Sequence, residues 1–193
     1  MLEGKSKGYS VIKKLSISDR RGKILMAKEI ILKQLILKNF KGIKSLTINF
    51  GKNVTNVKGD NGEGKTTIFD AFNWLLFDKN SSGSKNFEIK TLDDKNNAVH
   101  MLEHEVQGIL MVGCKELALK KVYSETWTRK RGCESKEMTA HSTDYFIDGT
   151  PKKKSEYEKY ITSMVDEVIF KLITDPMAFN KLPWKEQRNK IHD

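Results

Sequence analysis

The pattern of apolar and polar residues divides the first part of the chain into strand-like and helix-like segments. Residues 29–40 are rich in aliphatic and β-branched side chains, and residues 45–50 alternate polar with apolar side chains, which is typical of strands. Lys41 and Gly42 predict the turn between them. Residues 54–57 predict a third, short strand. Apolar side chains recur at helical spacing in Lys65–Phe77, which predicts an amphipathic helix.

The second part of the chain alternates short strand patterns with turn signals. Residues 78–97 are polar and predict a loop, and strand patterns follow at 105–111, 117–123, 125–128 and 145–147. We therefore expect an antiparallel β meander. A Ser-x-x-Glu capping box at Ser155 predicts a helix that ends near Glu167, residues 170–174 predict another strand, and Pro183 begins a final helix.

The segment between the third strand and the first helix carries candidate chemistry. Gly59, Gly64, Lys65 and Thr66 have the spacing of a phosphate-binding P-loop, which follows a strand and opens a helix. In such a loop, backbone N–H groups and the helix N-terminus bind phosphate, the lysine bridges the β- and γ-phosphates, and the threonine hydroxyl ligates Mg²⁺. We expect Mg-ATP to bind at Gly59, Asp60, Asn61, Gly62, Glu63, Gly64, Lys65, Thr66 and Thr67, with Thr66 as a metal ligand.

Composition narrows the class of protein. The chain has 193 residues, 38% of them hydrophobic and 31% charged, and its apolar runs are too short to span a bilayer, so we expect no membrane partner. Cys114 and Cys133 stand outside any Cys-x-x-Cys pair and predict reduced thiols in a cytoplasmic protein. The net charge of +10 suits a polyanionic partner such as DNA.

Half of that charge surplus lies in residues 1–25, which show no strong periodicity. We expect a basic, poorly ordered arm there. An alternative is that Met26 is the true start and residues 1–25 are translated leader, because Arg20, Arg21 and Gly22 fit a purine-rich ribosome-binding sequence. In both cases the folded part is expected at residues 26–183.

The residues around the loop resemble a known family. Gly-x-Asn-Gly-x-Gly-Lys-Thr-Thr, preceded by Leu-x-Leu-x-Asn-Phe-Lys-Gly at residues 35–42, resembles the N-terminal half of an SbcC-type ATPase head, an ABC family close to SMC and RecF/RecN proteins. The sequences at 87–93 and 143–149 resemble phage and Firmicutes members in particular. The resemblance implies an α/β P-loop NTPase fold, the N-terminal lobe of an ABC-type head, with an antiparallel β meander.

The resemblance also implies roles for single residues. Lys41 follows Asn-Phe, where the family often has Arg near the nucleotide, and Asn61 would approach the γ-phosphate. The family's Q-loop supplies a Gln to the metal and the attacking water near residues 173–176. Asp175 is the metal-competent side chain in that stretch, where no Gln stands. We therefore expect Lys41 at the nucleotide and Asp175 at the metal.

The family places its signature motif and its Walker B acidic pair in a second half-head, after a long coiled coil with a Cys-x-x-Cys zinc hook. This sequence contains none of these, although residues 184–193 fit the start of a helix leading into such a coiled coil. Without an acidic residue to orient water, we expect the chain to bind ATP and not to hydrolyse it alone.

The implied partners are a C-terminal half-head, a head-to-head dimer, DNA and an SbcD-like metallophosphoesterase nuclease, acting in double-strand-break repair or recombination. Two alternatives stay open: a truncated, non-catalytic remnant that binds nucleotide or DNA, and a RecF- or SMC-type DNA-binding ATPase. Trp127 stands beside Arg129, Lys130 and Arg131 at an expected hairpin tip, which predicts contacts with DNA phosphates. A solvated hairpin end is the competing interpretation.

Overall fold

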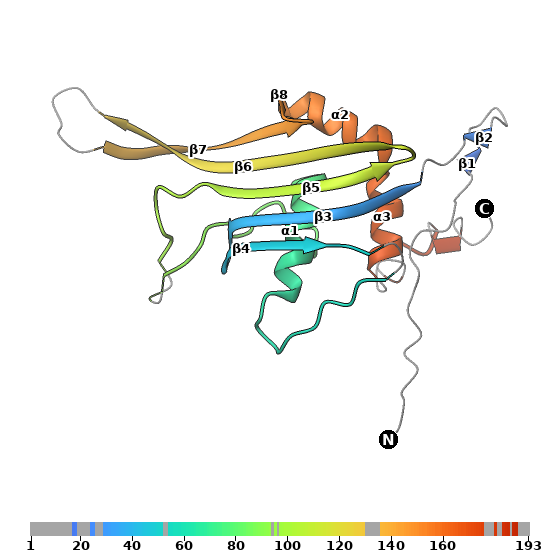
Figure 1. The fold of residues 1–193 in the computed structure, drawn as a ribbon, viewed down its shortest axis with the longest axis horizontal. Coiled ribbons are helices and arrows are strands. Elements are labelled where there is room, and N and C mark those ends of the chain that lie inside the picture. The colour runs from blue at the N-terminus through green and yellow to red at the C-terminus, as the bar shows by residue number, and fades with distance from the viewer. Residues whose placement is uncertain are drawn as a thin grey trace, which may run out of the picture.

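The computed structural model describes residues 17–18, 24–25, 29–51, 54–93, 95, 97–129, 136–175, 180, 183–185 and 187–188. The centre of the fold is one antiparallel sheet with helices packed on one face (Figure 1). The six strands lie in the order β4-β3-β5-β6-β7-β8. They are β3 (Ile30–Phe40), β4 (Ile43–Asn49), β5 (His104–Val112), β6 (Lys115–Arg129), β7 (Lys136–Ile147) and β8 (Thr150–Lys152). The predicted α/β class and the antiparallel meander are confirmed.

The helices are α1 (Lys65–Phe77), α2 (Lys154–Met164) and α3 (Glu167–Thr174). Helix α1 has the predicted bounds and follows the P-loop directly. In residues 1–25, the structure describes only β1 (Ile17–Ser18) and β2 (Ile24–Leu25), which pair antiparallel. Among the described residues, no helix is long and apolar enough to cross a membrane.

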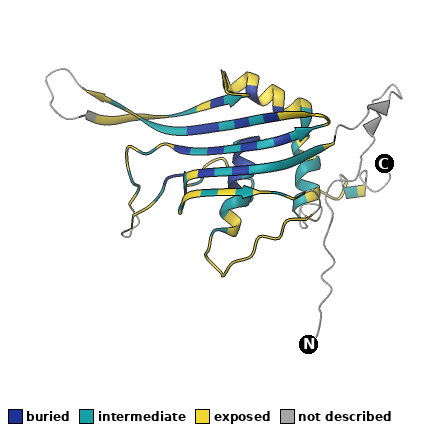
Figure 2. Cartoon of the chain, in the orientation of Figure 1, coloured by how far each residue is buried: buried dark blue, intermediate teal, exposed yellow. Residues whose placement is uncertain are grey.

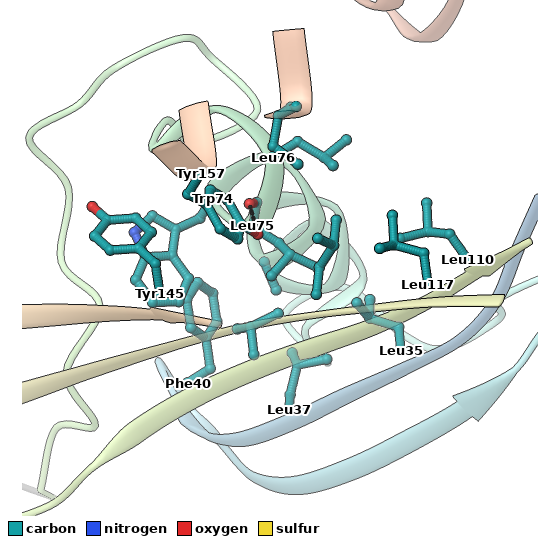
Figure 3. Close-up of a cluster of buried hydrophobic side chains, with 14 of the residues drawn as sticks. Leu35, Leu37, Phe40, Trp74, Leu75, Leu76, Leu110, Leu117, Tyr145 and Tyr157 are labelled. Atoms are coloured by element: carbon teal, nitrogen blue, oxygen red, sulfur yellow. Dashed lines mark hydrogen bonds between the residues drawn. The ribbon is translucent and has the colours of Figure 1, made fainter. Parts of the chain in front are cut away.

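The core forms where the apolar face of α1 meets the sheet (Figures 2 and 3). Leu35, Leu37 and Phe40 of β3 pack with Trp74 and Leu75 of α1, and all five are at most 4% exposed. On the neighbouring strand, a Cβ at Gly108 would stand 2.7 Å from Leu75 Cδ2. A side chain at Gly108 would therefore force the buried Leu75 side chain to move.

A buried lysine ties the C-terminal end of α1 to the sheet. Lys121 of β6 is 1% exposed, and its ammonium donates to Trp74 O at 2.7 Å and to Asp78 Oδ1 at 2.5 Å. Its Nζ also lies 5.0–5.6 Å from the ring centroids of Trp74, Tyr145 and Tyr157. Burial lowers the pKa of Lys121 to about 8, against the opposing effect of Asp78. The ammonium is thus mostly protonated at neutral pH and satisfies a helix C-terminal carbonyl.

Several predicted strands have different lengths in the structure. The strands predicted at 117–123 and 125–128 form one strand, β6, with a register shift between Thr126 and Trp127. Strand β7 starts at Lys136, well before the predicted start at residue 145. Because β5 pairing ends at His104↔Tyr123, β6 from Ser124 onward pairs with β7 alone among the described strands. This two-stranded ribbon projects from the sheet (Figure 1). Its residues do not alternate between apolar side chains facing a core and polar side chains facing solvent, so the length of the ribbon could not be predicted from the sequence.

The prediction of a strand at residues 54–57 was wrong. The structure assigns these residues no strand, and Val54 and Val57 are 44% and 42% exposed. Their β-branched side chains favour a strand locally, but a strand needs a neighbour for its backbone N–H and C=O groups. Within the described part of the chain, the six-stranded sheet does not extend to this segment.

The helices after the sheet also differ from the prediction. Helix α2 begins at Lys154 with Lys153 as its N-cap and no side-chain capping bond, so the capping box at Ser155 was wrong. The strand predicted at 170–174 is part of α3, whose N-cap Asp166 accepts from the N–H groups of Val168 and Ile169. This local cap, together with Phe170 packing on Phe72 and Phe77, outweighs the strand propensity of the apolar run.

Replacing Lys121 tests the tie between helix α1 and the sheet. We expect Lys121→Met to lower the free energy of unfolding by about 3 kcal/mol. It removes one of the two hydrogen bonds that Trp74 O accepts, leaving only the Asp78 N–H at 3.1 Å, and it takes the buried cation away from Asp78. Urea denaturation followed by circular dichroism measures the change. Lys120→Met is the matched control, because Lys120 lies 3.7 Å from Glu105 at a partly exposed position on the same strand. A loss in the control equal to that in Lys121→Met would contradict the assignment.

Candidate nucleotide-binding site

The P-loop of residues 59–66 closes around a pocket at the N-terminus of α1. Gly62 and Gly64 have φ values of 93° and 84°, which side chains rarely adopt, so the loop depends on glycine at both positions. The pocket has a volume of about 250 Å³ and is lined by Asn61, Gly62, Gly64, Lys65, Thr66 and Thr67. The structure thus brings six of the predicted nucleotide residues around one cavity.

Backbone carbonyls of the loop orient the lysine. Lys65 Nζ donates to Gly59 O at 2.6 Å and to Asp60 O at 2.7 Å. On the other side of the loop, Glu63 Oε2 accepts the N–H of Asp60 at 2.8 Å. Side chains of the loop therefore bond to its own backbone, and two backbone carbonyls hold the Lys65 ammonium in place.

The N-terminus of α1 is left open to an anion. Its N-cap is Gly64, which has no side chain to cap the helix, and its first turn contains no acidic residue. Helix α3 shows the contrast, because Asp166 caps two of its N–H groups. The first N–H groups of a helix need acceptors, and phosphate oxygens are well suited to supply them.

Lys41 lies in the β3–β4 turn beside this helix. Its ammonium pairs with the carboxylate of Asp70 on α1, and it stands 5.2 Å from the ring centroid of Phe87. Ile43, two residues further on, has its Cδ1 3.4 Å from the position that a Cβ on Gly64 would occupy. The turn therefore borders the P-loop, and a contact from Lys41 to the nucleotide stays a prediction. Its partner Asp70 lies within the helical pattern, and no sequence feature indicates the pairing.

The remaining predicted site residues are not among those that line the pocket. Asp175 is the C-cap of α3, and its N–H donates to Lys171 O at 2.8 Å. Arg129 is exposed at the end of β6, while Lys130 and Arg131 lie outside the described residues. Among the residues that the structure describes, no group of three or more His, Cys, Asp or Glu side chains could hold a metal ion. Mg²⁺ bound to a nucleotide takes several ligands from phosphate and water, so Thr66 at the pocket fits that role.

A buried carboxylate fixes the base of the β6–β7 ribbon. Glu125 is 1% exposed at its side chain and accepts hydrogen bonds from Lys90 Nζ, His100 Nδ1 and Trp127 Nε1 at 2.6–3.0 Å, and from the Met101 N–H at 3.1 Å. Burial raises the pKa of Glu125, but these donors outweigh burial and lower it to about 2. The loop before β5 is thereby fastened to the ribbon.

The sheet, the glycine-rich loop and the helix that it opens define a P-loop nucleoside-triphosphatase. Comparison with known proteins narrows this class: residues 34–174 match the AAA_23 family of AAA domains, so the chain belongs to that family. Its relatives are SMC- and Rad50-like ATPases, and the chain corresponds to the N-terminal part of such a head. The predicted family resemblance is confirmed; the link to phage and Firmicutes members stays a prediction.

Two curated relatives illustrate the similarity. The chain is 27% identical over 139 residues to the DNA double-strand break repair Rad50 ATPase of Methanococcus maripaludis, which covers 72% of this chain and 12% of that protein. It is 36% identical over 74 residues to the DNA replication and repair protein RecF of Clostridium kluyveri, covering 37% of this chain and 20% of RecF. The chain therefore spans only a small part of the length of these relatives.

Among solved structures, the SMC head domain from Thermotoga maritima has 21% sequence identity and a TM-score of 0.46, covering 67% of this chain and 41% of that one. The structure of RecF with ATP has 17% identity and a TM-score of 0.49, covering 80% of this chain and 44% of that one.

Titration of Glu125 gives a test of the ribbon base. A carboxylate with a folded pKa of about 2 stabilises the fold fully above its unfolded pKa, near 4.5, and loses this effect as the pH falls from 4.5 towards 2. We expect Glu125→Gln to be less stable than wild type at pH 7 and to lose less stability on acidification. Thermal unfolding between pH 7 and pH 2.5 measures both slopes. Parallel slopes in the two proteins would contradict this role of Glu125.

Proposed function

We propose that this chain is the ATP-binding N-terminal half of an SbcC-like ATPase head that acts on DNA in double-strand-break repair or recombination. The observation that carries the proposal is the open P-loop: Lys65 is held by two carbonyls beside a pocket of about 250 Å³ at an uncapped helix N-terminus. Phosphates fill such a pocket with little rearrangement of the loop. Membership of an ATPase family supports ATP as the nucleotide.

The nucleotide residues of the proposal are those of the loop and its flanks. Backbone N–H groups of residues 59–64 hold the phosphates, Lys65 bridges the β- and γ-phosphates, and Thr67 bonds a phosphate deeper in the loop. Bound Mg²⁺ would neutralise phosphate charge and would be held by the Thr66 hydroxyl, with Asp175 as its second protein ligand. Lys41 adds a positive charge from the neighbouring turn.

The exposed residues before the loop support a second half-head. Val54 and Val57 present β-branched side chains and a backbone that the described sheet does not pair. A C-terminal half-head that adds strands beside residues 54–57 would satisfy that backbone and would bring the Walker B and signature residues. We assign residues 26–183 to the N-terminal lobe and residues 184–193 to the start of a helix leading into a coiled coil. On this proposal, hydrolysis requires the second half and a head-to-head dimer.

DNA and a nuclease complete the proposed function. Strand β6 ends at Arg129, and the charges of Arg129 and of the next two residues in the sequence, Lys130 and Arg131, would contact DNA phosphates. An SbcD-like metallophosphoesterase is the proposed nuclease partner, and the exposed free thiol of Cys114 fits the reducing cytoplasm. A RecF- or SMC-type DNA-binding ATPase is the second candidate, because the chain also matches RecF and, over 46 residues at 50% identity, the chromosome partition protein Smc of Halothermothrix orenii.

Mg-ATP binding to wild type and Lys65→Ala tests the nucleotide site. We expect the wild type to bind ATP and Lys65→Ala to bind about tenfold to a hundredfold more weakly, because a charged hydrogen bond to phosphate is lost. Isothermal titration calorimetry measures the affinity, and Lys152→Ala, at an exposed lysine on β8, is the control. Failure of the wild type to bind ATP would contradict the P-loop assignment. ATP turnover by the chain alone would contradict the claim that it is half of a site.

DNA binding by the ribbon is tested with a triple variant. We expect replacement of Arg129, Lys130 and Arg131 by Ala to weaken duplex binding and to reduce the slope of log affinity against log salt by about 0.9 per lost phosphate contact. Fluorescence anisotropy at several salt concentrations measures both. A control variant with Ala at the exposed residues Lys152, Lys153 and Lys159 removes the same charge elsewhere. Equal losses in both variants would point to non-specific attraction and reject the ribbon as the DNA contact.

A further inference from the structure

An ion pair fastens the β3–β4 turn to the P-loop helix. The ammonium of Lys41 meets the carboxylate of Asp70, and the two side chains are 26% and 7% exposed. The other carboxylate oxygen of Asp70 accepts the N–H of Ser81 at 2.8 Å. Asp70 therefore holds three segments together: the turn, the helix that carries it and the start of the following loop.

This pair lies close to the proposed nucleotide site. Asp70 follows Lys65 by five residues on α1, which is about 7.5 Å along the helix axis. On the turn side, Ile43 packs against the last glycine of the loop, with Cδ1 3.4 Å from a Cβ position on Gly64. A movement of the turn would therefore change the packing of Gly64, where the phosphate-binding loop becomes helix.

The backbone of the β3–β4 turn adopts an unfavourable conformation that contacts with other segments must stabilise. Asn39 and Lys41 are non-glycine residues with φ values of 52° and 53°. This left-handed conformation is costly for residues with a Cβ and persists where surrounding contacts enforce it. The Asn39 carbonyl accepts from His104 Nδ1 at 2.5 Å and from Thr91 Oγ1 at 3.0 Å, and the Lys41 N–H donates to Ile89 O at 2.8 Å. These bonds fix the backbone, and the ion pair fixes the side chain that points to α1.

The charge of Asp70 is maintained at neutral pH. Burial raises its pKa, while hydrogen bonds from Lys41 and Ser81 outweigh burial and hold the pKa below the usual range. A neutral side chain of the same shape could still accept the Ser81 N–H, but it would leave the half-buried ammonium of Lys41 without its counter-charge. Asp70 and Lys41 thus act as a unit that a single neutral substitution breaks.

We propose that Asp70 is a positioning residue of the nucleotide site, which through its ion pair with Lys41 holds the β3–β4 turn and Ile43 against the phosphate-binding end of α1. The inference rests on the proposed ATP-binding function. It deepens that function by assigning affinity for the triphosphate to a residue outside the P-loop pattern. Breaking the pair lets the turn leave Gly64, so the loop has to be ordered again when nucleotide binds, and affinity falls.

A double-mutant cycle in the full chain tests this inference. We expect Asp70→Asn and Lys41→Met each to weaken Mg-ATP binding about tenfold, and the double variant to lose no more than either single change, because the pair acts as one unit. Asp70→Glu, which keeps the charge, is expected to recover most of the affinity. Calorimetric titration measures affinity at a temperature where circular dichroism shows each variant fully folded.

The control separates positioning from general stability. Glu167→Gln breaks another partly buried ion pair, with Lys79 at 2.6 Å, on the side of α3. We expect this variant to melt at a lower temperature and to bind ATP like wild type. Wild-type affinity in Asp70→Asn, or additive losses in the double variant, would overturn the inference while leaving the ATP site intact. Failure of wild type itself to bind ATP would instead reject the proposed function on which the inference rests.

Discussion

The two ends of helix α1 are treated in opposite ways, and the rest of the structure depends on this difference. At its C-terminal end, the buried ammonium of Lys121 donates to Trp74 O, and the Tyr157 hydroxyl donates to Leu75 O at 2.9 Å. A helix leaves its last carbonyls and its first N–H groups short of partners. Here α2 supplies a donor to Leu75 O, and the sheet adds a second donor to Trp74 O, which also accepts the Asp78 N–H. The N–H groups at the start are left for a ligand, because Gly64 cannot cap them. The fold thus fixes the C-terminal end of the helix and leaves its N-terminal end, where the helix dipole is positive, open to a ligand.

Sequence patterns predicted the parts of the structure that are determined by residues close to one another in the sequence. The P-loop is specified by glycines and a lysine within eight positions, and the helix after it by apolar spacing, so both were predicted from the sequence. The pairing of Lys41 with Asp70 joins residues 29 positions apart, and no periodicity records it. Similarly, the ribbon of β6 and β7 is held by cross-strand pairing and by Glu125 rather than by an apolar face, so its length escaped prediction. Helix α3 was mistaken for a strand because its apolar run is short and its cap, Asp166, lies outside that run.

The exposed segment before the P-loop connects fold and function. Val54 and Val57 have the composition of a central strand but lie beside no described strand. The chain also covers only 12% of the length of the Rad50 relative. The P-loop is formed, and the segment before it has no paired strand beside it among the described residues. Both features fit the proposal that a second half completes the site.

The close approach at Gly108 also has a genetic consequence. This residue belongs to β5, far along the chain from the P-loop, yet it leaves room for Leu75 on the helix that the P-loop opens. Any replacement there would place a Cβ 2.7 Å from Leu75 Cδ2, so the buried Leu75 side chain would have to move. In a screen for alleles that lose nucleotide binding, changes at codon 108 would then appear beside those in the glycine-rich loop. A map of such alleles would trace the contact between sheet and helix, and not only the residues that touch phosphate.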